Sequence, residues 1–223
     1  MLALFAKFFE KNKNILLAIE FLLLCVVLPT VIIVNRLAPY MLLFLWLAAL
    51  YCAYHLWKGS SKNFAKDTWK WHAVNKENMM KIIPRWLLAC AGMWLFMYFY
   101  DPSKLFIILY ERPMALPMIF LLYPLLSALP QELIFCSFFF HRYKPFMNSD
   151  VTRIIASAMV FAYAHVLYIN WVAPLFSFIG GLIFAHTYAK TRSLALVTVE
   201  HALYGNAMFL IGMGHYFWSG AVP

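Results

Sequence analysis

Several apolar stretches of this chain are close in length to a bilayer span, and no other feature constrains its fold as strongly. One of them, from Ile15 to Val34, contains a single ionisable residue, Glu20. A helix needs about 20 apolar residues to cross the hydrocarbon core, where the backbone must satisfy its own hydrogen bonds. The sequence is 65% hydrophobic and 12% charged, and a soluble domain has roughly twice that charged share. We therefore predict an all-α, polytopic integral membrane helical bundle.

We expect about seven transmembrane helices that form a single domain over residues 1–223. Their expected ranges are Ile15–Val34, Pro39–Trp57, Trp86–Tyr100, Met114–Phe140, Ile154–Tyr168, Val172–Tyr188 and Leu194–Trp218. The fourth range contains Pro117, Pro124 and Pro130. Proline removes a backbone hydrogen bond and crowds the preceding turn, so we expect this helix to be kinked or broken at one of them.

The lysines and arginines are divided unequally between the two sides of such a bundle. Fifteen lie on the side of the amino terminus, seven of them between Lys58 and Arg85, and three lie on the other side. Cytoplasmic loops collect positive charge, so we expect a cytoplasmic amino terminus and an outside carboxyl terminus. The expected location is a bacterial inner membrane. The formal net charge of +9 then reflects topology and attraction to anionic lipid headgroups. The expected partner is the lipid bilayer and not a nucleic acid.

Few ionisable side chains fall inside the expected spans, and three of them reach a similar depth. Counted from the basic ends of their helices, Glu132, His165 and His201 lie roughly 15, 18 and 13 Å deep. Ionisable groups at membrane depth are costly and usually mark function. We therefore predict that these three residues form one polar site. Glu20, alone in its apolar span, is better explained by a structural hydrogen bond or an interfacial position.

A carboxylate and two imidazoles at one site suggest hydrolysis of an acyl bond. A carboxylate in an apolar pocket can act as a general base toward water. Two imidazoles can stabilise an oxyanion or, together with the carboxylate, bind a divalent metal such as zinc. The metal ligands would then be His165, His201 and Glu132. The residue types leave both routes open, and they also leave open a proton relay in a small transporter.

The order and spacing of these residues resemble the CPBP family of intramembrane proteases, which contains CAAX proteases and bacteriocin-processing enzymes and is also called the Abi family. The family pattern is EExxxR on one helix, FxxxH on a later helix and HxxxN on a last helix. In this chain PQELIFCSFFFHRY, residues 130–143, stands at the first motif. FAYAH, Phe161 to His165, matches the second motif, and VEHALYGN, with His201, stands at the third. The resemblance covers about residues 85–218, which we expect to be the family-like core.

Two of the three motifs depart from the family pattern. Gln131 replaces the first glutamate, which the resemblance implies would activate water, and Cys136 replaces the arginine. Four residues after His201 stands Gly205, and Asn206 follows it. On an ideal helix Asn206 lies about 140° around from the histidine, so it reaches the site only if the helix is locally irregular.

The resemblance and these departures together assign roles to the candidate residues. Glu132 is the expected catalytic base, if the chain turns it inward near Pro130, with His165 and His201 as oxyanion-stabilising or metal-binding residues. Four further side chains are expected to support substrate or oxyanion binding, namely Gln131, Phe161, Asn206 and Arg142.

The resemblance implies an intramembrane endopeptidase, of the metallo type if a metal is used, that hydrolyses membrane-associated peptides or proteins such as CAAX-type or bacteriocin leader substrates. Because the departures fall at catalytic positions, two alternatives stay open. One is an inactive family member that acts as a membrane binding or immunity protein, and the other is a small transporter. Transporters often contain internal repeats, which are not evident here. The sequence indicates neither a particular substrate nor an oligomeric state.

Overall fold

The computed structural model describes residues 12–59 and 64–218. Over these residues all regular secondary structure is helical, and seven helices are long and apolar enough to cross a membrane. The spans are Asn14–Val34, Ala38–Gly59, Lys76–Tyr100, Ala115–Arg142, Asp150–Tyr168, Val172–Thr191 and Leu194–Ile211. The prediction of an all-α bundle with seven spans is confirmed, and the protein is an integral membrane protein.

Several spans are built from more than one helical segment. The α-helices are α2 (Lys13–Leu22), α3 (Leu28–Val34), α4 (Met41–Gly59), α5 (Phe64–Trp69), α6 (Lys76–Tyr100), α7 (Ile107–Glu111), α8 (Ala115–Tyr123), α9 (Leu129–Glu132), α10 (Phe139–Arg142), α11 (Asp150–Ala164), α12 (Val172–Thr191) and α13 (Leu194–Ile211). The π-helical segments that join them are η1 (Leu23–Val27), η5 (Pro124–Ala128) and η6 (Leu133–Phe138). Short 3-10 turns include η8 (Val166–Tyr168) and η9 (Met213–Phe217).

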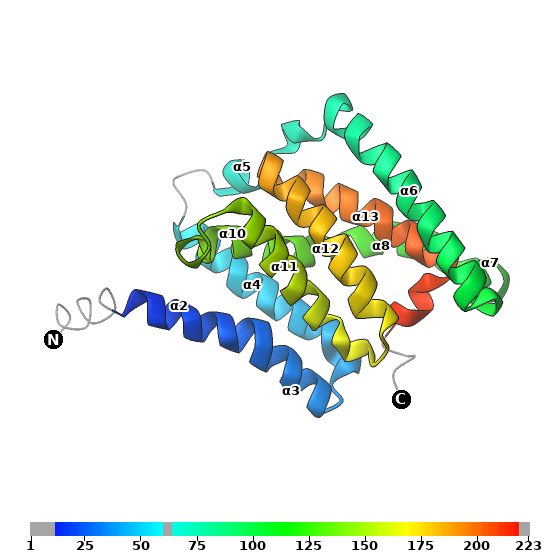
Figure 1. Ribbon diagram of the computed structural model, residues 1–223, viewed down its shortest axis with the longest axis horizontal. Helices are drawn as coiled ribbons and strands as arrows, with labels where there is room; N and C mark the ends of the chain where they lie inside the picture. The colour runs from blue at the N-terminus through cyan, green and yellow to red at the C-terminus, as the bar shows by residue number, and fades with distance from the viewer. Residues whose placement is uncertain (1–11, 60–63, 219–223) are drawn as a thin grey trace.

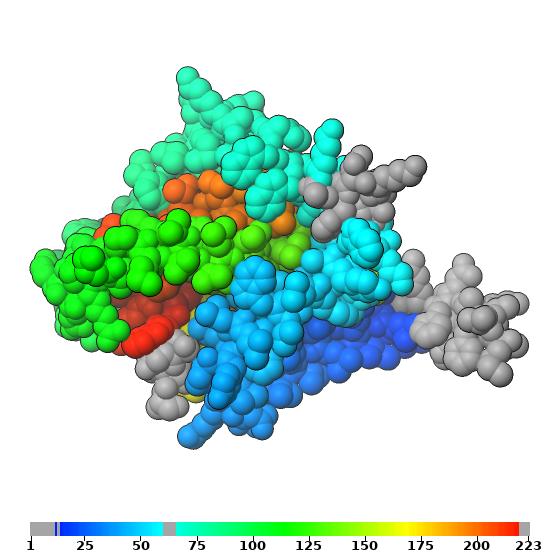
Figure 2. Space-filling view, turned by 180° about the vertical axis from the view of Figure 1, so that it is seen from behind, coloured from blue at the N-terminus to red at the C-terminus, as the bar shows by residue number. Residues whose placement is uncertain are grey.

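The last span, α13, lies in the interior of the bundle. Buried residues make up 72% of the most apolar 18-residue stretch of this span, against 17% of the corresponding stretch in each of the first three spans. In Figure 1, α11, α12 and α13 cross the middle of the molecule, while α2 and α3 follow one edge and α6 follows the opposite edge. Figure 2 shows the other face, where α4 and α8 lie at the surface. Side chains that meet α13 therefore lie near the centre of the bundle.

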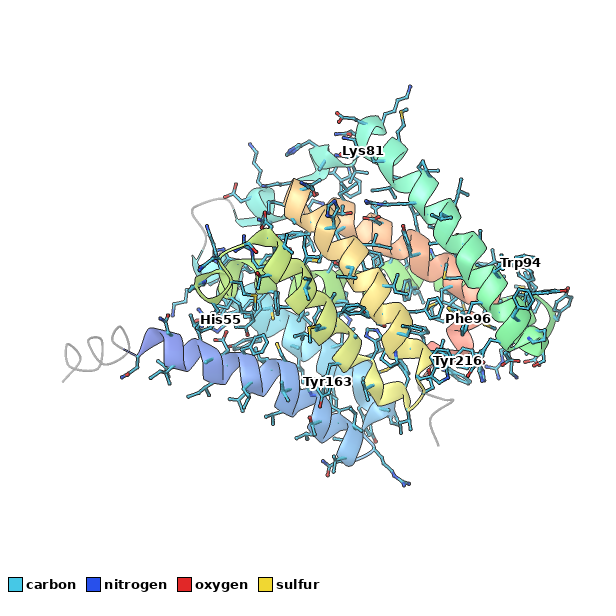
Figure 3. The ribbon with its side chains drawn as sticks, viewed as in Figure 1. His55, Lys81, Trp94, Phe96, Tyr163 and Tyr216 are labelled. Atoms are coloured by element: carbon cyan, nitrogen blue, oxygen red, sulfur yellow. The ribbon has the colours of Figure 1, made fainter. Side chains whose placement is uncertain are left out.

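The first span is tied to the rest of the bundle by polar contacts at two levels. Glu20 forms an ion pair with Arg142 through two bonds, Nε to Oε1 at 2.8 Å and Nη2 to Oε2 at 2.5 Å. The hydroxyl of Tyr51 donates to the same carboxylate at 3.2 Å. Further along the span, the hydroxyl of Thr30 lies 2.7 Å from that of Tyr163, which Figure 3 labels. Glu20 thus makes the structural hydrogen bonds that its position predicts.

The fourth span is one continuous run from Ala115 to Arg142 that contains two π-helical stretches. The first, η5, begins at Pro124, and the second, η6, directly follows Glu132. A π turn fits an additional residue into the helix, and it therefore rotates the residues on either side relative to each other. The helix is not broken at any of its three prolines; at Pro124 it continues as a π-helical stretch, and a kink there stays a prediction. Pro130 lies between the two stretches, within α9.

The third span begins earlier than predicted. The sequence predicts a polar loop up to Trp86, but α6 already begins at Lys76 and continues through Pro84. Its start is capped by Asn75, whose side-chain oxygen accepts a hydrogen bond from the backbone N–H of Asn78 at 3.0 Å. Such a cap satisfies one of the free N–H groups of the first turn, so a helix can start within polar sequence.

The last span ends earlier than predicted. It stops at Ile211 and not at Trp218, because Gly212 has a φ of 102°. This left-handed conformation favours glycine and ends the helix. The Ile211 carbonyl then accepts a hydrogen bond from the backbone N–H of Phe106 at 2.9 Å. After this point η9 folds back over the end of the bundle that contains His165.

Candidate active site

The α9 segment turns Glu132 toward α13, between the two π-helical stretches. Glu132 is 1% exposed, and its Oε1 lies 2.7 Å from Nδ1 of His201. An ionised carboxylate only accepts hydrogen bonds, so Nδ1 of His201 carries the proton and Nε2 is left as an acceptor. The thiol of Cys136, one turn further along, lies beside the same carboxylate. The structure therefore brings together the candidate acid and one of the two candidate histidines.

Aromatic side chains hold the His201 ring in place. Phe184 of α12 stacks on it with the ring centroids 4.4 Å apart, and Phe161 of α11 meets it edge-on at 5.8 Å. Nε2 of His201 lies 2.9 Å from the hydroxyl of Tyr123, at the end of α8. Because Nε2 is an acceptor in this tautomer, the tyrosine donates this hydrogen bond. His201 thus has a carboxylate at one nitrogen and a hydroxyl at the other.

His165 follows α11 directly, and its ring is fixed by the backbone of the same helix. Its Nδ1 lies 2.7 Å from the carbonyl oxygen of Phe161, four residues earlier. A carbonyl only accepts, so Nδ1 donates and Nε2 carries the lone pair of the neutral ring. The rings of Phe161, Tyr168 and Phe217 surround it at centroid distances of 4.5, 5.9 and 5.9 Å. The FxxxH spacing therefore positions the histidine through an i, i+4 contact.

His165 and His201 face one cavity of about 310 Å³. Its walls come from α6, α8, α11, α12 and α13, and Phe217 of η9 also lines it. Glu132 is not among the lining residues, so its carboxylate reaches this space through the His201 ring. The two imidazoles share the cavity and are not hydrogen-bonded to each other in the described part of the chain. Tyr123, Ser177 and Tyr204 also line this cavity.

Gln131 faces a second cavity of about 140 Å³, on the other side of the fourth span. This cavity lies among the first two spans, the fourth span and α11, and its lining is mostly apolar. Nε2 of Gln131 donates to the hydroxyl of Ser127 at 2.8 Å. Neighbouring helix residues point about 100° apart, which explains why Gln131 and Glu132 face different spaces. His165 lines both cavities and so lies at their boundary.

Two of the predicted support residues are not brought to the site. Arg142 is bound to Glu20 near the end of the fourth span, so its charge is directed away from the cavity. Asn206 lies on a regular part of α13 and lines neither cavity. The local irregularity that would turn it toward His201 does not occur, because α13 runs without interruption to Ile211.

A comparison with known protein families agrees with the resemblance that the motifs indicate. Residues 113–207 match the Rce1-like family of type II CAAX prenyl endopeptidases. The resemblance to CAAX proteases is confirmed over this segment, which is shorter than the predicted core of residues 85–218. No curated protein and no solved structure matches the chain.

The Rce1-like segment begins just before α8 and ends within α13, so it contains the whole candidate site. Glu132, His165 and His201 lie in it, and so does Tyr123. The first two spans and α6 lie outside it, although α6 contributes one wall of the larger cavity. At the level of the family, the match supports an intramembrane CAAX-type protease.

The residues at the candidate site do not fit the divalent-metal centre that the sequence left open. Nδ1 of His201 faces Glu132 and Nε2 faces Tyr123, so neither nitrogen points to a space that it shares with His165 and the carboxylate. Among the described residues, no group of three or more His, Cys, Asp or Glu side chains is arranged to hold a metal ion. We therefore derive no step through a metal.

Tyr123 is a site residue that the sequence analysis missed. On an ideal helix it would lie about 180° around from Glu132, so no spacing rule connects the two residues. The π-helical stretch η5 lies between them and reduces this angle, because each of its turns contains more residues. The one usable signal was Pro124, which marks the start of that stretch.

A second buried acid lies next to the site on α13. Glu200 forms an ion pair with Arg85 of α6, with Nη2 and Oε1 2.6 Å apart. The hydroxyl of Thr187 donates to its other oxygen at 2.5 Å. The presence of Glu200 inside the last span signals a polar partner, but the sequence did not identify Arg85 as that partner because it lies at the end of the predicted loop.

Proposed function

We propose that the protein is an intramembrane endopeptidase that hydrolyses a peptide bond of a membrane-associated, CAAX-type substrate. The observation that carries the proposal is the 2.7 Å contact between Glu132 and His201, whose ring lines a buried cavity together with His165. The Rce1-like match over the same helices supports this class of reaction.

The Glu132–His201 pair acts as the general base. His201 takes the proton at Nε2, and the Glu132 carboxylate stabilises the imidazolium that forms. Carboxylate–imidazole pairs perform this task in hydrolases of unrelated folds. The pair also accounts for Gln131, whose amide has no basic atom to activate water. Glu132 then works through His201, which refines the expectation that it contacts water itself.

His165 binds the attacking water. Its Nδ1 donates to the Phe161 carbonyl, so Nε2 of the neutral ring accepts a hydrogen bond from a water molecule in the cavity. In this tautomer Nε2 has no proton to donate to an oxyanion. We therefore assign His165 to the water and not to the oxyanion role expected from the sequence.

The smaller cavity supplies a site for the lipid portion of a CAAX-type substrate. Its mostly apolar lining borders His165, so a prenyl chain bound there would hold the adjoining peptide near the histidines. Apolar burial contributes about 0.8 kcal/mol per CH₂ group. The amide of Gln131 lies in the same cavity and can form a hydrogen bond with the peptide backbone.

The test is cleavage of a farnesylated peptide ending in Cys-Ala-Ala-X by the purified protein in lipid nanodiscs. Glu132→Gln should lower kcat by about 10²- to 10⁴-fold, because it removes the charge that stabilises the imidazolium and preserves the side-chain volume. Glu20→Gln is the matched control, because Glu20 is also an acid within a span but lies outside the site. This control should retain its activity.

Gln131→Glu separates an active enzyme from an inactive family member. In an enzyme that uses the Glu132–His201 pair, the added carboxylate should change the rate modestly or lower it by repulsion with Glu132. If the wild type cleaves nothing and Gln131→Glu creates activity, the proposal is wrong and the chain is an inactive, partner-binding member. Full activity of Glu132→Gln would instead remove the base assignment.

A further inference from the structure

The Tyr123 hydroxyl joins the Glu132–His201 pair in a hydrogen-bonded chain at the wall of the larger cavity. It is 2.9 Å from Nε2 of His201, and the residue lines the cavity together with His165. Glu132 is bound to Nδ1, so Nε2 is the nitrogen at which His201 can take up a proton. The Tyr123 hydroxyl already donates a hydrogen bond to this nitrogen. With both nitrogens of His201 hydrogen-bonded, a proton from water in the cavity can reach Nε2 through the Tyr123 hydroxyl.

The space for the Tyr123 ring is provided by Gly205. This glycine lies one turn after His201 on α13, at the position where the family pattern has asparagine. A Cβ atom at residue 205 would overlap both the ring and the hydroxyl of Tyr123. Phe209, one turn further on, meets the same ring edge-on with the centroids 5.4 Å apart. Two positions of α13 thus fix the ring so that its hydroxyl reaches His201.

We propose that Tyr123 is a catalytic residue that relays the proton between the attacking water and His201. This inference rests on the proposed function and adds a residue that lies outside the three sequence motifs. It explains why the chain has a glycine four residues after His201. The hydroxyl from α8 fills the space that a side chain at residue 205 would take.

The relay conserves every proton and electron pair. The water oxygen bonds to the carbonyl carbon, and the π electrons of the C=O bond move to its oxygen. The water proton passes to the Tyr123 oxygen while the tyrosine's own proton passes to Nε2 of His201, whose positive charge faces Glu132. The C=O bond then re-forms, and the C–N bond breaks with its electron pair on nitrogen. The proton returns from His201 through Tyr123 to this amine.

Tyr123→Phe tests the relay in the same peptide assay, because it removes one oxygen atom and keeps the ring against Gly205. It should lower kcat by at least about 10²-fold, while KM and the melting temperature stay close to those of the wild type. Tyr204→Phe is the matched control. Tyr204 lines the same cavity and is buried, but it makes no hydrogen bond to His201, so its variant should keep the wild-type kcat.

A solvent isotope measurement gives a readout that a structural role would not affect. Two protons move together in the relay, so a plot of the wild-type kcat against the fraction of D₂O in the solvent should be curved. The residual activity of Tyr123→Phe should follow a straight line. A curve that is unchanged in Tyr123→Phe would overturn the relay.

Gly205→Ala tests whether the position of Tyr123 matters. Alone, it should displace the ring and lower both stability and kcat. Combined with Tyr123→Ala, which removes the clash but leaves a cavity, it should destabilise less than the sum of the two single changes and should not recover kcat, since the hydroxyl is gone. If Glu132→Gln is inactive while Tyr123→Phe keeps the full kcat, the relay is wrong and the proposed function stands. If the wild type cleaves no farnesylated peptide, both proposals fail.

Discussion

Two glutamates at membrane depth meet at α13 with different partners. Glu132 faces the imidazole of His201, whereas Glu200, the residue before that histidine, faces the guanidinium of Arg85 and the hydroxyl of Thr187. Both acids are almost fully buried, at 1% and 0% exposure. His201 lines the larger cavity, and Glu200 lines neither cavity. The two acids therefore differ in partner and in access, and not in burial.

The partner of each acid decides whether the pair can serve only to hold helices together or can also transfer a proton. A guanidinium stays protonated at any pH a protein experiences, so Arg85 can fix α6 against α13 through Glu200 but cannot accept a proton as a base. An imidazole can take up and release a proton, and His201 lies at the edge of a cavity. An acid inside the membrane indicates a specific polar partner, and the identity of that partner decides between the two roles.

Arg85→Ala should produce the largest loss of stability among the changes that leave the catalytic groups untouched. Breaking a buried ion pair costs about 3–5 kcal/mol, because it leaves an uncompensated charge. The Arg85 side chain is 32% exposed and that of Glu200 is 0% exposed, so we expect the lower end, about 3 kcal/mol. The free energy of unfolding in mixed micelles measures the effect.

The control for Arg85→Ala is Lys81→Ala, one turn earlier on α6. Lys81 pairs with Glu77, and both side chains are exposed, at 65% and 78%. Such an exposed pair is screened by solvent and contributes little to stability, so Lys81→Ala should change stability little. Peptidase activity per folded molecule should survive in both variants. If Arg85→Ala leaves stability unchanged and abolishes activity, the Arg85–Glu200 pair belongs to the site and the contrast with Glu132 disappears.

The sequence predicted the class of fold and most span boundaries because both follow from hydrophobic length. It predicted the ends of helices less accurately where a capping side chain or a glycine sets them. Asn75 starts α6 within polar sequence, and Gly212 ends α13 before its apolar run is over. The orientation of the bundle depends on the membrane and on the charge split, and it stays a prediction.

The candidate site was predicted where spacing and depth carry the information. Glu132 and His201 are hydrogen-bonded, and His165 shares a cavity with His201. The contribution of Tyr123 depends on a π-helical stretch and on the space above Gly205, and neither follows from counting residues on an ideal helix. The pairing of Arg142 with Glu20 joins helices far apart in the chain, so the sequence could not identify it.

The helix α13 carries both Glu200 and His201. Ser193→Ala tests whether the start of this helix matters equally for the Arg85–Glu200 pair and for the Glu132–His201 pair. The Ser193 hydroxyl accepts from the backbone N–H of Leu196 at 3.1 Å and contacts the carbonyl oxygens of Trp69 and Lys70. Loss of an N-cap costs about 0.5–2 kcal/mol, and we expect the upper half because Ser193 is fully buried. Thermal unfolding measures this loss.

The matched cap for comparison is Ser149, which caps α11 by accepting from Thr152 at 3.0 Å. It is exposed, so Ser149→Ala should cost less, about 0.5–1 kcal/mol. Neither variant should alter activity per folded molecule. A selective loss of activity in Ser193→Ala would show that the start of α13 sets the geometry of His201 and not only the stability of the bundle.

Glu20→Gln should cost less stability than Arg85→Ala and Ser193→Ala, and it extends the comparison to a third acid. Glu20 resembles Glu200 in having an arginine partner, but its pair is more accessible, with side-chain exposures of 31% for Arg142 and 13% for Glu20. We expect a loss of about 1 kcal/mol, between the values for exposed and buried pairs. Arg142→Lys should cost a similar amount, because lysine keeps the charge but not the two parallel bonds. Both variants should cleave the farnesylated peptide at the wild-type rate, since an acid held by arginine at a distance from the cavity transfers no proton. A loss of activity in Glu20→Gln as large as that in Glu132→Gln would contradict the proposal that the partner, and not burial, distinguishes the catalytic acid.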